Sequence, residues 1–141
     1  MRDLHNQVAV RHTLVPAVVS ADTTSTTVDR RGFESVEHAV IAGQSGDTLS
    51  GSLKIDIRLE HSHDASVWEA VTTPDVIGAD VDAAGFFATI DDAAEDEAVY
   101  RIGYIGGRRY SRVVADFTGT HTNGTPMAAL ALLGHAHAKP V

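Results

Sequence analysis

The chain contains no cysteine among its 141 residues, and this absence excludes several kinds of stabilisation at once. Without thiols there is no disulfide framework and no thiolate ligand for a structural metal. A protein without disulfides also suits assembly in a reducing cytoplasm. The chain must therefore hold together by packing, and a single domain of this length has enough core to do so.

Basic residues and long apolar runs are also scarce. Lys and Arg number 11 against 19 Asp and Glu, which gives a formal net charge of −8. An acidic chain without a basic stripe repels phosphate backbones, so we expect no nucleic-acid partner. The longest apolar stretch, residues 127–133, is far shorter than the ~20 residues of a membrane span. The first residues are too polar for a secretory signal, and we expect no membrane partner.

The clearest positive signal is an alternation of apolar and charged residues between positions 52 and 61. Side chains of a strand point to opposite faces in turn, so this stretch has one dry face and one wet face. Such a strand is typical of an antiparallel sheet that covers a core on one side. The pattern therefore predicts the all-β class.

Further strands are predicted on both sides of this one. Pro16 predicts that the strand at 13–19 lies at a sheet edge or is broken. Gly106-Gly107 favours a tight hairpin between strands 99–105 and 109–117. Turn signals separate about eight or nine strands, which predicts an antiparallel β-sandwich or jelly-roll-like single domain. The other predicted strands cover 26–30, 33–42, 52–60, a return strand holding Trp68 and Val71, 86–90 and 127–133. We expect the sandwich to occupy residues 13–134. Residues 1–12 form an N-terminal arm or first short strand, and residues 135–141 form a short tail.

The core is expected at the inward positions of these strands. Burying a large aliphatic side chain is worth roughly 1.5–3 kcal/mol, so these positions should decide stability. The predicted core residues are Leu53, Ile55, Ile57, Leu59, Trp68, Val99, Ile102, Val113, Phe117 and Leu130.

Histidines and an acidic run are the candidate metal ligands. His61 and His63 share a face in extended chain, as do His135 and His137, and two such pairs would make a four-histidine site if the strand ends met. Solvated histidines at strand ends are the simpler interpretation, because no HExxH motif is present. The acidic run 91–97 lacks the spacing and glycine of a calcium loop. We expect no metal and no cofactor, and leave the role of the histidine pairs open.

No catalytic constellation stands out. The segment Gly43-Gln-Ser-Gly is not the G-x-S-x-G nucleophile motif, and a turn between strands explains it better. Adjacent carboxylates such as Asp91 and Asp92 point apart in a strand and do not form a glycosidase pair. We therefore expect that the protein is not an enzyme and has no catalytic residues.

Two arginine pairs provide the positive charge. One cluster is Arg108-Arg109, with Arg101 and Arg112 nearby, and the second is Arg30-Arg31. Cross-strand pairing with nearby acids is one interpretation. The other is that they are interface arginines that bind a carboxylate on a partner subunit.

Several segments resemble a family of small structural proteins of tailed bacteriophages and prophages, encoded near the head genes. The resemblance runs along nearly the whole chain and lies in the order of its segments. They are Met1-Arg-Asp-Leu-His-Asn, Val28-Asp-Arg-Arg-Gly-Phe-Glu-Ser, residues 59–68, Tyr100-Arg-Ile-Gly-Tyr-Ile-Gly-Gly-Arg-Arg-Tyr and Leu133-Gly-His.

The resemblance implies a virion structural protein. Its most specific form is a capsid decoration, or cement, protein that binds the outer face of the major capsid protein shell and stabilises it. Such a protein is made in the host cytoplasm and resides on the outer capsid surface. By analogy with other cement proteins we expect self-association as a homotrimer. The candidate interface residues are Arg2, Asp3, Leu4, His5, Asn6, Arg30, Arg31, Arg108 and Arg109.

Two alternatives stay open. One is a neck, head–tail connector, tail or fibre-associated component of the same virion. The other, from a different class, is a carbohydrate-binding β-sandwich for host attachment, with Trp68, Tyr104 and Tyr110 as stacking residues.

Overall fold

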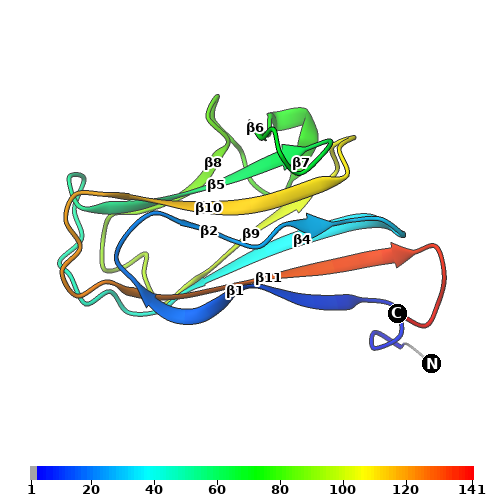
Figure 1. The fold of residues 1–141 in the computed structure, drawn as a ribbon. Coiled ribbons are helices and arrows are strands. Elements are labelled where there is room, and N and C mark those ends of the chain that lie inside the picture. The colour runs from blue at the N-terminus through cyan, green and yellow to red at the C-terminus, as the bar shows by residue number, and fades with distance from the viewer. Residues whose placement is uncertain (1–2) are drawn as a thin grey trace.

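The strands form two antiparallel sheets that face each other across one core (Figure 1). The computed structural model describes residues 3–141. The five-stranded sheet has the order β1 (Ala9–Val19), β11 (Thr125–Ala136), β4 (Phe33–Ala42), β9 (Val99–Tyr104) and β7 (Val76–Ile77). In the six-stranded sheet β10 (Tyr110–Thr118) and β5 (Lys54–Ser62) lie at the centre. β2 (Thr23–Thr24) and β3 (Val28–Asp29) flank β10, and β6 (Glu69–Ala70) and β8 (Phe86–Ile90) flank β5.

This arrangement confirms the predicted all-β sandwich. It has eleven strands where about eight or nine were expected, and the two that were not predicted, β2 and β7, have only two residues each. A 3-10 turn (Thr73–Asp75) precedes β7. Among the described residues no helix is long and apolar enough to span a membrane.

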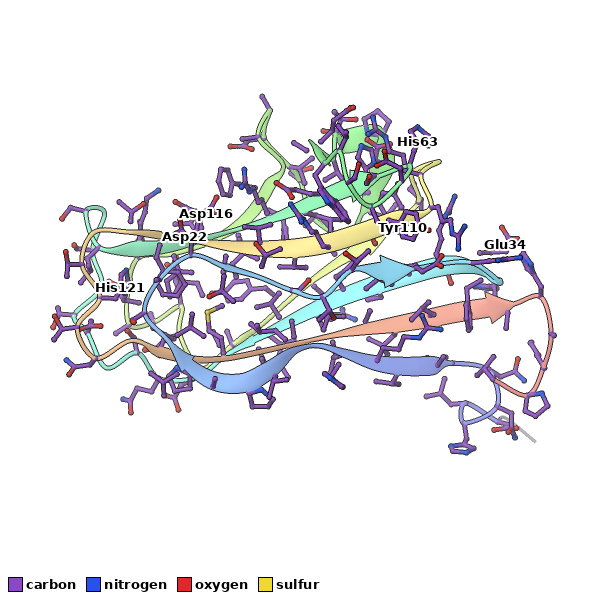
Figure 2. All side chains as sticks on the ribbon, in the orientation of Figure 1. Asp22, Glu34, His63, Tyr110, Asp116 and His121 are labelled. Carbon is purple, nitrogen blue, oxygen red and sulfur yellow. The ribbon has the colours of Figure 1, made fainter. Side chains whose placement is uncertain are left out.

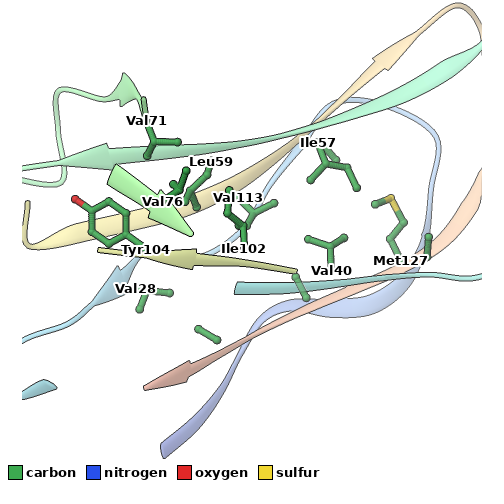
Figure 3. Packing of buried hydrophobic residues seen from close by; sticks show 14 of the residues in the cluster. Val28, Val40, Ile57, Leu59, Val71, Val76, Ile102, Tyr104, Val113 and Met127 are labelled. Carbon is green, nitrogen blue, oxygen red and sulfur yellow. The ribbon is translucent and has the colours of Figure 1, made fainter. Parts of the chain in front are cut away.

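The apolar side chains of β5 point into the core, as the alternation predicts. Ile55, Ile57 and Leu59 are each 0% exposed and lie beside their cross-strand neighbours on β10. Val113, opposite Leu59, and Ile102 on the facing sheet belong to the same cluster (Figure 3). These residues form the contact between the two layers.

Five of the expected core residues are not fully buried. Leu53 precedes β5, and Phe117 lies near the end of β10, so both are only partly covered. Val99 and Leu130 stand on the outer face, because β9 directs Ile102 inward and β11 directs Ala129 and Ala131 inward. Trp68 lies just before β6, outside the core, with the Arg112 guanidinium 4.0 Å from its ring centroid.

The hairpin expected at Gly106-Gly107 is wrong. β9 pairs with β4 and β7, whereas β10 pairs with β5, β2 and β3, so the connection crosses from one sheet to the other. Neither glycine has the positive φ that a two-residue hairpin turn needs. Gly106 instead passes close to the Tyr104 ring, where an added Cβ would approach to 2.7 Å.

Both chain ends join the five-stranded sheet. β1 begins at Ala9, which pairs with Leu133, and β11 continues to Ala136. Strand pairing therefore includes residues 9–12 of the expected arm or first short strand, and residues 135–136 of the expected tail. β1 is an edge strand with register shifts on either side of Leu14, close to Pro16, as the proline predicts.

Candidate interaction face

The two outer faces of the sandwich differ in chemistry. On the six-stranded sheet, charges are paired across neighbouring strands: Arg58 with Asp116 at 3.2 Å, and Arg112 with Glu60 at 2.7 Å. Lys54 pairs with Asp56 in the same strand at 2.8 Å. Opposite charges on adjacent strands stabilise one another and leave this face hydrated and locally neutral.

The outer face of the five-stranded sheet is apolar. Its strands place hydrophobic side chains outward as well as inward, and several remain solvent-exposed: Val10 by 62%, Ile77 by 56% and Val99 by 58%. The cross-strand register aligns Val10 with Leu132 and Ile41 with Val99. We call this surface the apolar face and define it by Val10, Ile41, Ile77, Val99, Leu130 and Leu132.

The apolar face carries little charge. Glu37 and Arg101 lie within it and pair with each other at 3.7 Å, so they neutralise one another. Exposed apolar patches of this kind are typical of surfaces that bind another molecule.

Hollows run along the apolar face. One of about 390 Å³ lies where Gly103 and Gly134 carry no side chain, with Leu132, Ile77 and Ile105 around it. A second lies under the N-terminal segment, between Leu4, Val10 and Leu132. Such recesses give a partner's side chains places to insert.

The predicted N-terminal interface residues meet this face in part. Asp3 accepts a hydrogen bond from the Asn6 backbone N–H at 3.1 Å, which closes a turn before β1. Leu4, 73% exposed, and His5 extend the apolar face beyond Val10. Arg2 lies outside the described residues.

The structure brings the two predicted arginine pairs to the same end of the sandwich. The Arg30 backbone N–H donates to the Arg109 carbonyl at 3.2 Å. Arg109 holds Asp29 through Nε at 2.9 Å and Nη2 at 2.6 Å, and this hydrogen bonding lowers the pKa of Asp29 to about 2. Arg108 pairs with Glu69. Arg108 and Arg109 therefore fit the pairing interpretation, whereas Arg30 and Arg31 do not.

The histidine pairs do not meet in one site. His61 is buried and its Nδ1 lies 3.0 Å from the Tyr104 hydroxyl, while burial lowers its pKa; His63 is exposed. His135 and His137 lie at the end of β11 in the other sheet, bonded to Ser35 and Glu34. Within residues 3–141 no group of His, Asp and Glu is arranged to hold a metal ion. The oxygens of Glu95 and Asp96 accept backbone hydrogen bonds from Asp91 and Ser45.

Two serine–histidine pairs lie within hydrogen-bond distance: Ser111 with His38 in the buried core, and Ser35 with His135 at the surface. The Ser35 Oγ lies 2.9 Å from His135 Nδ1 at the rim of the larger hollow. In the described part of the chain, no third group hydrogen-bonds the other ring nitrogen. The pair therefore lacks the group that orients the base in nucleophilic catalysis.

Sequence reasoning missed the apolar face, although a signal was present. Residues 127–133 are apolar at every position, which is typical of a strand covered on both sides. In the structure only one side of β11 faces the core, and the other side lies in the apolar face.

Comparisons with known proteins add no relative: no family model matches the sequence, and no curated protein matches it. The surfaces of the molecule must therefore carry the functional argument.

Proposed function

We propose that this protein is a virion structural protein, and specifically a capsid decoration protein that docks on the outer surface of the major capsid protein shell. The apolar face is the single observation that supports docking on another protein. Its opposite, the outer face of the six-stranded sheet, is a paired and hydrated charge network suited to face solvent.

The size of the apolar face suits a stable contact. Four longer strands spaced by ~4.8 Å, with about ten residues each rising ~3.4 Å, cover roughly 650 Å². A standard protein–protein interface buries about 800 Å² per partner. A protein that binds the assembled shell and not its free subunits raises the stability of the shell by mass action.

The carbohydrate-binding alternative needs open aromatic rings. Tyr104 is buried, with 1% exposed. The guanidinium of Arg112 covers Trp68, and that of Arg109 lies 4.9 Å from the Tyr110 ring centroid. The arrangement of these three rings therefore favours a structural role over sugar stacking.

The decisive experiment adds purified protein to capsids that lack it and counts the bound copies per particle. Saturation at hundreds of copies, in a multiple set by the shell's symmetry, supports decoration. A handful of copies at one vertex assigns the protein to the neck or tail instead. No binding to the particle overturns the proposal.

A pair of variants tests the apolar face itself. Val10→Glu with Val99→Glu places two charges on it at exposed positions, so the fold is retained. We expect shell affinity to fall more than tenfold, because two carboxylates must be desolvated at the contact. Val67→Glu is the matched control: it is a valine 64% exposed in the turn before β6. Undiminished binding by the double variant would show that the shell contact lies elsewhere.

A further inference from the structure

The arginines that lack a carboxylate partner gather at one end of the molecule. Arg58, Arg101, Arg108, Arg109 and Arg112 each pair with an acid. In residues 3–141, no carboxylate lies within 4.0 Å of the guanidinium nitrogens of the other three. These three, which we call the arginine end, are Arg11, Arg30 and Arg31. Unneutralised bases are unexpected in a chain where acids are in large excess.

The acids of this end are already engaged. Both oxygens of Asp29 accept from Arg109, and one also accepts the Arg31 backbone N–H at 2.9 Å. Glu34 binds His137. The Arg11 and Arg30 guanidiniums lie 5.7 and 5.9 Å from the ring centroids of Phe33 and Tyr104, which fixes their direction without neutralising them.

A hollow of about 380 Å³ lies beside Arg30 and Arg31. Glu34 also lines it, but its carboxylate is held by His137. An added Cβ at Gly32 or Gly107 would meet nothing within 4 Å, so both glycines border open space. A segment bearing carboxylates would find there two charged forks with free donors, the geometry that carboxylates bind best.

Unbalanced acidic charge lies at the opposite end. Figure 2 shows Glu34 and Tyr110 at one end of the sandwich and His121 at the other. The segment 91–97, here the acidic loop, belongs to the His121 end: Asp96 accepts from the backbone of Ser45, in the loop that also contacts Gly124. Asp92 and Glu97 are exposed on it.

We propose that the arginine end of one copy binds the acidic loop of a second copy. The contact is head to tail, since the two surfaces lie at opposite ends of the chain's sandwich. Such a contact closes into a ring when its rotation permits, and extends into a filament when it does not. It uses no residue that defines the apolar face, so it does not depend on the proposed shell contact.

Charge reversal and complementation test the proposal by sedimentation velocity in low salt, about 25 mM, and at increasing protein concentration. We expect the wild-type mass to rise above the 14.9 kDa of one chain and to return to it in high salt, about 500 mM. R30E/R31E and D92K/E97K should each weaken self-association more than tenfold. An equimolar mixture of the two variants should recover it, because each retains one native surface and the two reversed surfaces attract.

Arg101→Glu makes the same change per residue on the apolar face and is the matched control; its self-association should equal that of the wild type. Recovery in the mixture is a gain that misfolded variants cannot produce. A wild-type protein that stays at one chain's mass at every concentration and salt overturns the proposal. It is equally overturned if R30E/R31E self-associates normally. If R30E/R31E loses shell binding while the wild type stays monomeric, the arginine end belongs to the shell contact and the second-copy assignment is wrong.

Discussion

At the scale of single residues, His38 shows how strongly burial changes a titratable side chain. It lies on β4 with 0% exposure, and its Nε2 is 2.8 Å from the Ser111 Oγ on β10, so it joins the two sheets. Burial lowers the pKa of His38 to about 4, because a charged imidazole would lose its hydration. The alternation along residues 33–42 predicts that Val36, His38 and Val40 share a face. It does not reveal that His38 finds Ser111, 73 residues away in the sequence.

This burial makes stability depend on pH. The unfolded chain protonates His38 near pH 6.5 and the folded chain near 4, so the unfolded state holds more protons between these values. The free energy of unfolding should therefore fall as pH drops through this window, by about 3 kcal/mol at its lower end. Urea unfolding at pH 7, 5.5 and 4.5 measures it. His38→Gln keeps a hydrogen-bonding group opposite Ser111 without the titration and should reduce the dependence, while His61, whose pKa burial also lowers, retains part of it. Equal slopes in both proteins would contradict this origin.

At the scale of elements, the local alternation of residues predicted where the strands lie, but not which strands pair with one another. The predicted strands 33–42 and 86–90 coincide with β4 and β8, because the alternation of inward and outward side chains can be read from neighbouring residues. The partners of β9 and β10 are far away in sequence, so the Gly106-Gly107 pair suggested a hairpin, whereas the two strands belong to different sheets.

In the connection between β9 and β10, alanine should destabilise the protein at Gly106 and be tolerated at Gly107. A Cβ on Gly106 would lie 2.7 Å from the ring and the hydroxyl oxygen of Tyr104, which is 1% exposed and bonded to His61. Gly106→Ala should lower the free energy of unfolding by about 1–3 kcal/mol through overpacking, which lowers the melting temperature by several degrees. Gly107→Ala meets no atom within 4 Å and should melt like the wild type. Identical melting of the two variants would contradict the close approach.

At the scale of the whole molecule, the sandwich presents two unlike sides. The sequence predicted the wet side of β5, because charges alternate there with core residues. It did not predict the apolar face, whose residues come from five strands and become neighbours only through the sheet order β1-β11-β4-β9-β7. The arginine pairs were found in sequence, and folding decided which of them kept a free guanidinium.

The exposed apolar face should be detectable without any partner. We expect the native protein to raise the fluorescence of an uncharged solvatochromic dye such as Nile red, because the hollows along the sheet shelter apolar surface. Val10→Glu with Val99→Glu should remove most of this signal, and Val67→Glu should leave it unchanged. A signal insensitive to the double variant would mean that the dye binds another surface.

The broken edge of β1 has a consequence for how this protein avoids aggregation. An apolar sheet with long, regular edges would recruit further chains strand by strand into fibrils. Here Pro16 and the register shifts interrupt one edge, and the other edge, β7, is two residues long. Growth of the sheet sideways is therefore disfavoured at these edges, while its flat outer surface stays exposed.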